Sequence, residues 1–494
     1  MDAPAQRRRT VPQQVLARLA APVTLAVGDD GSAVACVADQ SIPLGMLSRE
    51  AAARAAALAA RGLQVVRRRG PVEGELAALL QRLARRGFLE YGVARDRRDE
   101  HAVIEPQTPF YWPQEVELES SDTVALSRFA LLRRRGSDFV LESPRADALF
   151  RLRDPGIAGM LARLAEPQRI SRLRYHAGFC GTTLLGLLVQ SGILFTVAEG
   201  DDGGRATEGG GEMALWDFHD LLFHARSTAG RHANPLGGVY RYAGLVGPLP
   251  AVRPPWPGKP IDLDAVTGPA APPPVSALSA LLRERRSTRD FDAAHPVTLA
   301  ELARFLETTA RVLWRSAPGE DGSEIAPRPY PSAGSSYELE LYVAVHQCDG
   351  LGRGFYHYDA GDHALAPVGA RDPDLQMLFG EALYATAAEA FPQIVIVIAA
   401  RFGRVSWKYA SLAYSLVLKN AGVLLQNFYL TATQMGLGGC ATGICNVELF
   451  ARMTGLDFEV EGPVGEFMLG RPMPKFGGDA RGDHDPGDGG APTA

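Results

Sequence analysis

Four arginines surround two hydroxyl residues in the segment RERRSTRDFD, directly after a short helical pattern. The arginines are Arg283, Arg285, Arg286 and Arg289, and the hydroxyl residues are Ser287 and Thr288. Guanidinium groups form bidentate, charge-assisted hydrogen bonds that match a phosphate, and hydroxyls add further donors. A solvated arginine run on a helix is the commoner origin of such a pattern. The segment alone leaves both interpretations open.

Two loops of small residues could approach a flat ligand. PYPSAGSSYELELYVAV places Ser332, Ala333, Gly334 and Ser335 before a strand, and QMGLGGCATGICN places Leu437, Gly438 and Gly439 after a helical pattern. Small residues let backbone and hydroxyl groups come close to a planar group that larger side chains would exclude. Ordinary turns have the same composition. Arg471, at the end of an apolar strand pattern in GEFMLGRP, is equally ambiguous by itself.

Lysine is rare in this chain, so each lysine is informative. Only four of the 51 basic residues are lysines, and Lys408 is followed by Tyr409. The pattern predicts a helix of about 28 residues that begins near Ser406, with this pair in its first turn. The helix macrodipole disfavours a cation there by up to about 1 kcal/mol. A desolvated lysine near positive charge can act as a base, which arginine cannot, but a lysine that reaches water at a helix start is an equally good interpretation.

The cysteines and histidines do not converge on a metal site. Cys440 and Cys445 form one C-x4-C pair without a second pair, and His219 and His224 are five residues apart on a helical pattern, on different faces. His232 lies beyond a glycine. Five scattered cysteines are typical of reduced thiols. We therefore expect no metal.

Composition excludes several classes of protein. A net charge of −5 provides no general attraction to nucleic acid, and 46% hydrophobic with 22% charged residues is typical of a globular chain. The longest apolar run, Ile394 to Ala400, is far shorter than the roughly 20 residues that span a bilayer. The N-terminus MDAPAQRRRTVPQQ lacks the apolar segment of a signal peptide. We expect a cytoplasmic protein without nucleic-acid or membrane partners.

The first 197 residues contain a repeated pattern, which predicts two modules, residues 1–105 and 106–197. Hairpin patterns at 23–37 and 123–144 each precede helical patterns. Leu79, Leu80, Leu83, Gly87 and Leu89 match Leu184, Leu185, Leu188, Gly192 and Leu194 at a constant offset of 105. A small sheet with about three helices is the outline of a winged-helix-like unit. An open sheet edge in such a unit could capture a leader peptide, although a scaffold or dimer surface is a slightly better interpretation.

The remaining chain divides into three parts. Residues 198–274 predict a linker with an acidic glycine-rich start, an amphipathic helix at 213–230 and a proline-rich strap at 248–260. Residues 275–474 alternate helical and strand patterns, which predicts an α/β or α+β domain. The polar, glycine-rich tail 475–494 is typical of disorder.

Taken in order, the motifs of the last domain resemble those of a known family. RRSTRDF, PYPSAGSSYELELYV, GRGFYHYDAGDHAL, the WKY segment, GLGGCATG and VGEFMLG resemble the SagB-type azoline dehydrogenases of the nitroreductase superfamily, over roughly residues 280–472. These enzymes use FMN at a homodimer interface and oxidise peptide thiazolines and oxazolines to thiazoles and oxazoles. The resemblance implies an α+β fold. A C-terminal nitroreductase-like FMN domain would follow two small winged-helix-like modules of the peptide-recognition type.

The resemblance also assigns roles to residues. Arg285, Arg286, Ser287, Arg289 and Arg471 would hold the phosphate and ribityl end of FMN. The isoalloxazine would lie along Ser332, Ala333, Gly334, Ser335, Leu437, Gly438 and Gly439. Lys408 and Tyr409 match the catalytic Lys-Tyr pair. The segment ICNVELF departs from the glycine- and Asp- or Ser-rich loop of relatives, so no role follows for Asn446 or Glu448.

We therefore expect FMN-dependent oxidation of peptide thiazolines or oxazolines in the biosynthesis of a ribosomal peptide natural product. The partners would be an azoline-containing precursor peptide, a cyclodehydratase and a second copy of the chain. An NAD(P)H-dependent nitro or quinone reductase would use the same flavin site without needing the N-terminal half or the Lys-Tyr pair. A catalytically silent scaffold subunit would need neither the lysine nor the phosphate-binding arginines.

Overall fold

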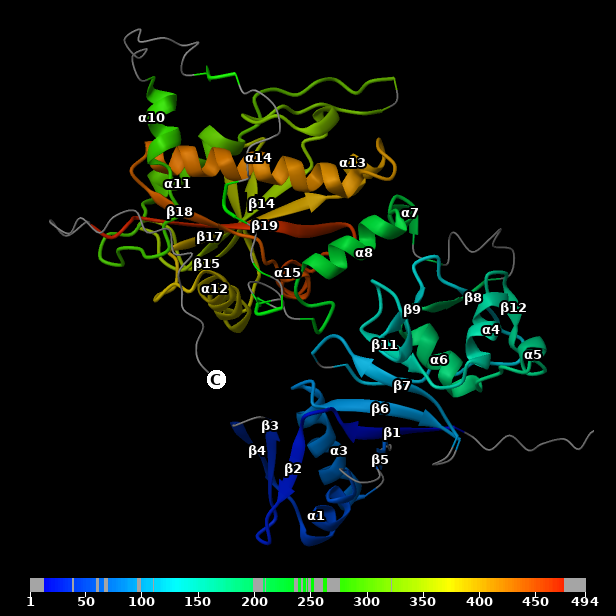
Figure 1. Cartoon of the computed structure of the whole chain (residues 1–494). Coiled ribbons are helices and arrows are strands. Elements are labelled where there is room, and N and C mark those ends of the chain that lie inside the picture. Colours follow the sequence, from blue (N-terminus) through cyan, green and yellow to red (C-terminus); the bar gives the residue numbers. More distant parts are fainter. Residues whose placement is uncertain are drawn as a thin grey trace, which may run out of the picture.

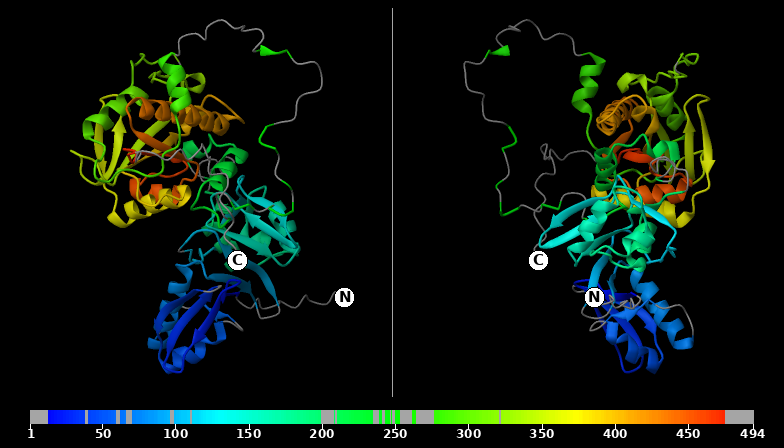
Figure 2. Two further views of the ribbon diagram at one scale, coloured as in Figure 1. Left: turned by 60° about the vertical axis from the view of Figure 1, so that its left-hand side comes forward. Right: turned by 90° about the vertical axis from the view of Figure 1, so that its right-hand side faces the viewer.

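The computed structural model divides into an N-terminal half made of small sheets and helices and a C-terminal α+β domain (Figures 1 and 2). It describes residues 13–37, 40–58, 62–65, 70–95, 99–109, 111–198, 208, 210–234, 239–240, 243–245, 247, 250–252, 261–263, 276–320 and 322–474. The predicted tail, most of the predicted strap and about half of the predicted linker region 198–274 lie outside these residues.

The first module is built around β1. Its elements are β1 (Gln14–Leu19), β2 (Thr24–Val27), β3 (Ser32–Val37), β4 (Gln40–Met46), α1 (Arg49–Ala55), β5 (Leu63–Gln64), α3 (Pro71–Ala84), β6 (Leu89–Ala94) and β7 (Glu100–Pro106). Strands β5 and β6 pair antiparallel with the two edges of β1. Strands β2, β3 and β4 form a separate three-stranded sheet, which contains the predicted hairpin.

The second module repeats this arrangement. Its elements are β8 (Thr123–Leu126), β9 (Leu131–Arg135), β10 (Asp138–Glu142), β11 (Ala148–Leu152), α4 (Gly156–Arg163), β12 (Gln168–Arg169), α5 (Ile170–Leu173), α6 (Thr182–Gln190) and β13 (Leu194–Thr196). Strands β12 and β13 flank β8 in the same antiparallel way. In both modules the first strand is therefore the centre of a small sheet, and the last helix leads into one of its edges.

The repeated leucine and glycine positions have a common structural cause. Gly87 and Gly192 follow α3 and α6 with φ of 69° and 65°, in the left-handed region that favours glycine. One residue further on, the N–H groups of Phe88 and Ile193 each donate to a helix carbonyl 3.0 Å away. Each glycine thus ends its helix and turns the chain into the next strand.

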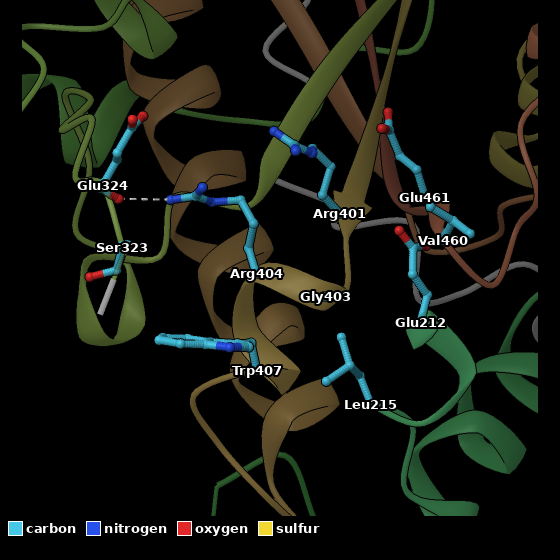
Figure 3. Close-up of a pocket in the computed structure, with 11 residues that line it drawn as sticks. Glu212, Leu215, Ser323, Glu324, Arg401, Gly403, Arg404, Trp407, Val460 and Glu461 are labelled. Carbon is cyan, nitrogen blue, oxygen red and sulfur yellow. Dashed lines mark hydrogen bonds between the residues drawn. The ribbon is translucent and has the colours of Figure 1, made fainter. Parts of the chain in front are cut away.

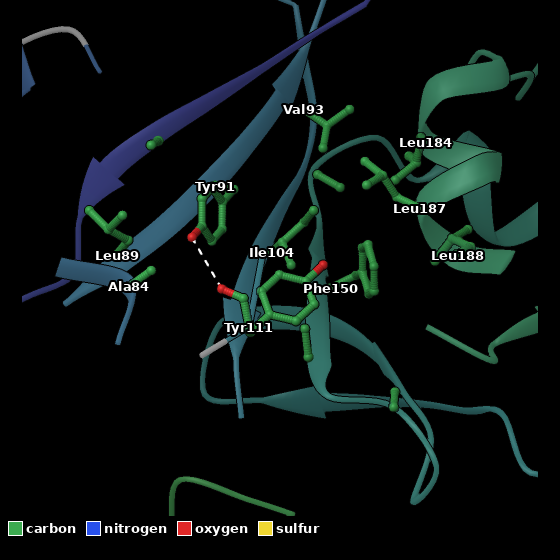
Figure 4. Close-up of a cluster of buried hydrophobic side chains, with 14 of the residues drawn as sticks. Ala84, Leu89, Tyr91, Val93, Ile104, Tyr111, Phe150, Leu184, Leu187 and Leu188 are labelled. Carbon is green, nitrogen blue, oxygen red and sulfur yellow. Dashed lines mark hydrogen bonds between the residues drawn. The ribbon is translucent and has the colours of Figure 1, made fainter. Parts of the chain in front are cut away.

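The two modules share one sheet and one hydrophobic core. The seven strands run β5-β1-β6-β7-β11-β10-β9, and β7 pairs with β11 with Ile104 opposite Phe150. The predicted boundary at residues 105 and 106 falls inside β7. Figure 4 shows Val93 and Ile104 of the first module in one cluster with Phe150 and the leucines of α6. This shared core joins the modules into one unit.

The second module and the linker that follows it both pack directly on the C-terminal domain. The linker contains α7 (Gly210–Met213) and α8 (Phe218–Ser227), which is the predicted amphipathic helix. Phe129 is fully buried in the core of the C-terminal domain. The Arg145 guanidinium lies 2.9 Å from the Glu459 carboxylate, and the Trp216 indole donates to the Glu459 carbonyl.

The C-terminal domain is a six-stranded sheet covered by helices on both faces. Its elements are α10 (Ala277–Glu284), α11 (Leu299–Ala310), the 3-10 turn η1 (Ala333–Ser335), β14 (Leu339–Val345), β15 (Gly354–Asp359), β16 (Ala364–Val368), α12 (Asp372–Thr386), β17 (Ile394–Arg401), α13 (Gly403–Ser406), α14 (Ala413–Gln434), β18 (Gly438–Thr442), α15 (Val447–Thr454) and β19 (Glu461–Gly470). The order β16-β15-β14-β17-β19-β18 is antiparallel throughout, which makes the domain α+β as predicted.

The apolar run at Ile394 to Ala400 is explained by this double covering. On β17, Ile394, Ile396 and Ile398 face the core under α11 and α14. Their neighbours Val395, Val397 and Ala399 face the second core under α12 and α15. A strand buried on both faces needs no polar alternation. Within the described residues no helix is both long and apolar enough to cross a bilayer.

Candidate functional site

The loop of small residues before β14 is strained and held by a polar side chain of α14. Gly334, Ser335 and Tyr337 have φ of 56°, 56° and 45°. The Asn420 side chain accepts from the N–H of Ala333 at 3.1 Å and donates to the Glu338 carboxylate at 2.8 Å. Glu338 has no solvent exposure, so this anchor lies inside the domain. Strained backbone that the surroundings over-determine is typical of ligand sites.

Lys408 and Tyr409 contact this same loop. The Lys408 ammonium donates to the Gly334 carbonyl at 2.9 Å. A Cβ atom on Gly334 would lie 2.2 Å from the Tyr409 hydroxyl, so only glycine leaves room for the tyrosine. The structure therefore brings the Lys-Tyr pair to the predicted Ser332–Ser335 loop.

The predicted position of the pair on a helix was wrong. The expected single helix is split into α13 and α14, and Lys408 and Tyr409 lie in the connection between them. Their N–H groups donate to the Val405 carbonyl at 3.0 and 2.9 Å, at the C-terminal end of α13, and Ser411 has a φ of 64°. The argument from an unfavourable helix N-terminus therefore does not hold for Lys408, because a helix C-terminus favours a cation.

The start of α14 is capped from a distant part of the chain. The N–H of Tyr414, in the first turn of α14, donates to the Asp220 carboxylate of α8 at 3.1 Å. A side-chain acceptor for a free N–H of the first turn stabilises a helix start. The linker helix α8 thus helps to set the residue at which α14 begins, and so keeps Lys408 and Tyr409 outside α14.

The arginine segment meets the second loop of small residues. The N–H of Thr288 donates to the Gly439 carbonyl at 2.8 Å, and a Cβ on Gly438 would lie 2.6 Å from the Thr288 side chain. The Ser287 hydroxyl is 3.0 Å from the Tyr429 hydroxyl, and the Arg285 guanidinium lies 5.1 Å from the centre of the Tyr429 ring.

The other residues predicted in the arginine segment and the second small-residue loop differ in exposure. Arg289 is half-buried and Arg286 exposed, while Leu437, Gly438 and Gly439 are buried beneath the arginine segment.

Arg471 is paired with a carboxylate that the sequence analysis did not identify. Its guanidinium donates to both oxygens of Glu301 at 2.8 Å and to the His295 carbonyl at 3.2 Å. Burial opposes ionisation of Glu301, but Arg471 and Thr298 together hold the pKa of its carboxyl below the usual value. The backbone of Arg471 also accepts from the N–H of Asp292, which places it close to the arginine segment.

Three polar side chains of α14 connect these loops. Asn420 holds the Ser332–Ser335 loop, Asn427 donates to the Pro329 carbonyl at 2.8 Å, and the Tyr429 hydroxyl accepts from the N–H of Ala441 at 2.9 Å. The sequence analysis missed all three. The sequence feature that could have identified them is a set of polar side chains within an otherwise apolar helix. Asn420 and Asn427, seven residues apart, share a face of that helix, and Tyr429 follows two residues later.

The segment ICNVELF, which departs from the family pattern, binds the linker residues that follow α8. The N–H of Ala229 donates to the Cys445 carbonyl at 2.7 Å, and the Ala229 carbonyl accepts from the N–H of Val447 at 3.1 Å. Arg231 lies 2.8 Å from the Glu448 carboxylate. Asn446 caps α15 by accepting from the N–H of Leu449. The departure thus corresponds to a docking site for residues 229–231.

The metal-ligating residue types in the described ranges form no group of three or more. Cys440 and Cys445 are both buried and free. His224 is enclosed by aromatic rings, and burial lowers its pKa to about 3, so this imidazole is a neutral packing group.

Two family models match this chain. The nitroreductase family model matches residues 282–471, and the model of the cyanobactin oxidase ThcOx matches residues 124–233. The second match covers the second module and α8, and ends beside the linker residues that dock onto ICNVELF.

Individual relatives were found among known proteins and solved structures. A protein of Methanocaldococcus jannaschii named as a nitroreductase is 31% identical over 166 residues, which are 34% of this chain and 78% of that protein. A Ralstonia eutropha structure named as a nitroreductase is 26% identical, covers 41% of this chain and 87% of its own, and has a TM-score of 0.33. The E. coli microcin synthetase McbBCD complex with truncated pro-MccB17 bound is 19% identical over 52% of this chain and 95% of that chain, with a TM-score of 0.37.

The family follows from the match of sequence. The relative of known sequence is covered over more than three quarters of its length at 31% identity, and the family model spans the whole six-stranded domain. The chain therefore belongs to the nitroreductase family of flavin oxidoreductases.

Proposed function

We propose that this protein is an FMN-dependent dehydrogenase that oxidises peptide thiazolines or oxazolines to thiazoles or oxazoles. The observation that carries the proposal is the contact of Lys408 and Tyr409 with Gly334. An oxidoreductase that only exchanges hydride with a nicotinamide has no need of a lysine and a tyrosine against its flavin loop. The match of residues 124–233 to the cyanobactin oxidase model supports a peptide substrate.

The residues present fit FMN. Both loops are built of small residues, which would let a flat ring approach the backbone. Gly334 and Gly438 lie directly against Tyr409 and Thr288, where a Cβ would collide. Arg285, Arg286, Ser287, Arg289 and Arg471 would hold the phosphate and ribityl end, and Ser332, Ala333, Gly334, Ser335, Leu437, Gly438 and Gly439 would line the ring. Arg471 would then share its charge between Glu301 and the phosphate. FMN, when bound, supplies the hydride acceptor.

The chain's own residues would carry the proton. Aromatisation of an azoline removes a hydride from one ring carbon and a proton from its neighbour, so a base must face the second carbon. Lys408 is the candidate base, and the Tyr409 hydroxyl can orient it or relay the proton. The carbonyl of Gly334 holds the Lys408 nitrogen at the loop, which positions it before the substrate binds.

Three substitutions test this assignment. Lys408→Ala and Tyr409→Phe should keep FMN and the fold but lose oxidation by about 10²- to 10⁴-fold, the usual effect of removing a general base. Lys408→Arg should fail as well, because a guanidinium stays charged. The assay is mass-spectrometric detection of the loss of two hydrogens from a synthetic thiazoline peptide, with flavin absorbance as the loading control. Normal turnover by flavin-loaded Lys408→Arg would overturn the acid-base role.

The same preparation separates the proposed activity from the reductase alternative. The protein is incubated with NADH and nitrofurazone, and in parallel with the thiazoline peptide under air. Rapid nitro reduction without any thiazole formation would identify a reductase. The absence of flavin from purified and reconstituted protein would exclude both enzymes.

We also infer that the protein is a homodimer that acts with a cyclodehydratase, and that its N-terminal modules recognise the precursor peptide. Strand β9 ends the seven-stranded sheet and could accept an added peptide strand. Multi-angle light scattering tests the dimer. Co-purification with a cyclodehydratase, if one is encoded beside this gene, tests the partner.

A further inference from the structure

A cavity of about 570 Å³ lies beside the Lys-Tyr segment, between the linker and the C-terminal domain. Figure 3 shows Arg401, Arg404 and Trp407 on one side, projecting from β17 and α13, and Glu212 and Leu215 on the other side, from α7 and the residue pair that follows it. The volume matches that of a site for a small molecule or a few peptide residues. None of the residues assigned to FMN lines it.

The cavity lies beside the candidate active site, and residues of both contact one loop. The Arg404 guanidinium donates from Nε to the Ser336 carbonyl at 2.7 Å, while Lys408 donates to the Gly334 carbonyl of the same loop at 2.9 Å. Trp407 directly precedes Lys408 in the chain. A peptide whose azoline ring lies at Lys408 therefore has its neighbouring residue within reach of this cavity.

One wall of the cavity carries positive charge that the protein does not neutralise closely. Arg401 is exposed, and its nearest carboxylate, that of Glu340, is 3.9 Å away. Within the described residues, the Arg404 guanidinium donates to the carbonyl groups of Ser336 and Glu324. Burial, then the charges of Arg401 and Arg328, lower the pKa of Arg404 from its usual value, as expected where cations face each other.

Three glutamates, Glu212, Glu324 and Glu461, also line the cavity. Glu461 accepts a hydrogen bond from the Tyr342 hydroxyl at 2.6 Å, and burial raises the pKa of its carboxyl. Glu212 is exposed to solvent. Trp407 has 56% of its surface exposed and presents an indole ring to the cavity (Figure 3).

We propose that this cavity binds a carboxylate of the peptide substrate in the residue next to the azoline, with Arg401 and Arg404 as its cationic partners and the Trp407 indole as an apolar platform. The proposal rests on the proposed function, because it places the azoline at Lys408. The carboxylate is either an Asp or Glu side chain or a peptide C-terminus, since both present the same anion to a guanidinium.

Four synthetic thiazoline tripeptides distinguish these sources. The residue that follows the ring is Glu or Gln, and the C-terminus is a free acid or an amide. We expect kcat/KM for peptides with one carboxylate to exceed that of the neutral Gln amide by roughly tenfold at low ionic strength, mostly through KM. The preference should decline with added salt. The peptide class with the larger preference identifies the side-chain or the C-terminal source.

Variants then assign the preference to this cavity. Arg401→Gln should lower kcat/KM for the carboxylate peptides toward that of the neutral peptide, and Arg401→Lys should retain most of the preference. Arg304→Gln removes the same charge from the exposed face of α11. This control should change neither kcat/KM for the carboxylate peptides nor the preference for them over the neutral peptide. Affinity for the unreactive thiazole forms of the four peptides, measured by calorimetry, should show the same order without any turnover.

The outcomes separate the two proposals. Equal affinities of the neutral and carboxylate thiazole peptides, or an unchanged preference in Arg401→Gln, would overturn the carboxylate site. A carboxylate preference in binding together with no oxidation by flavin-loaded protein would support the site and overturn the proposed function.

Discussion

Glu466 places a carboxyl group inside the C-terminal domain, where its protonation links stability to pH. The residue is on β19, 3% exposed, and its closest polar partner is the Thr442 hydroxyl at 3.2 Å. Burial and the nearby Glu381 carboxylate raise its pKa to about 8 from the ordinary value of 4.5. The folded domain therefore keeps this proton at pH values where the unfolded chain has lost it.

The size and sign of the effect follow from this difference. A raised pKa stabilises the fold fully below pH 4.5, and this stabilisation is lost as pH rises toward 8. Each pH unit in that window changes the free energy of unfolding by about 1.4 kcal/mol per proton, so the whole window amounts to roughly 5 kcal/mol at most. Glu466→Gln keeps a neutral group of the same shape and removes this dependence.

The assay is urea unfolding of wild type and Glu466→Gln at pH values from 5 to 8, followed by tryptophan fluorescence. The variant should gain stability relative to wild type as pH rises, with little difference near pH 5. Glu389→Gln, an exposed carboxylate on the same domain, should leave the pH dependence unchanged. Parallel curves for wild type and Glu466→Gln would refute a buried, protonated Glu466.

Three further predictions concern the site and its surroundings. Asp220→Ala removes the acceptor for the Tyr414 N–H, which should cost about 1 kcal/mol of stability and lower kcat. Asp220→Asn keeps an acceptor oxygen and should restore both the stability and kcat. Equal melting temperatures and rates for wild type and Asp220→Ala would contradict the cap. Gly334→Ala should fold but lose most activity, because its Cβ would lie 2.2 Å from the Tyr409 hydroxyl; full turnover by this variant would exclude the close contact. Arg134→Pro should weaken precursor binding relative to Arg134→Ala, as measured by fluorescence anisotropy. Arg134 is separated by one residue from the two-residue turn of the β9–β10 hairpin, so its N–H should point to the free edge of β9. Proline removes that N–H.

Local rules made the N-terminal repeat readable from the sequence. A helix that ends on a left-handed residue needs glycine at that position, so Gly87 and Gly192 mark the same event in both modules. The apolar run of β17 likewise indicated a buried strand, because only a strand covered on both faces lacks polar alternation. These patterns depend on neighbours within a few residues.

The position of the Lys-Tyr pair depended on distant contacts. Helical periodicity continues through residues 406–434 without a proline or glycine at the break, so the sequence predicted one helix. The break occurs at Ser411, and the new helix start receives its cap from Asp220, almost two hundred residues earlier in the chain. No window of neighbouring residues contains that information.

The sequence by itself determined the α+β class, the repeated helix-glycine-strand pattern and the residue types of the candidate site, because periodicity, capping glycines and motif order are local properties of the chain. Only the tertiary structure decided that Lys408 leaves the helix to contact Gly334, that Arg471 pairs with Glu301, and that a cationic cavity opens beside Trp407. Each of these joins segments far apart in sequence, and such pairs are selected by packing and electrostatics that exist only once the chain has folded.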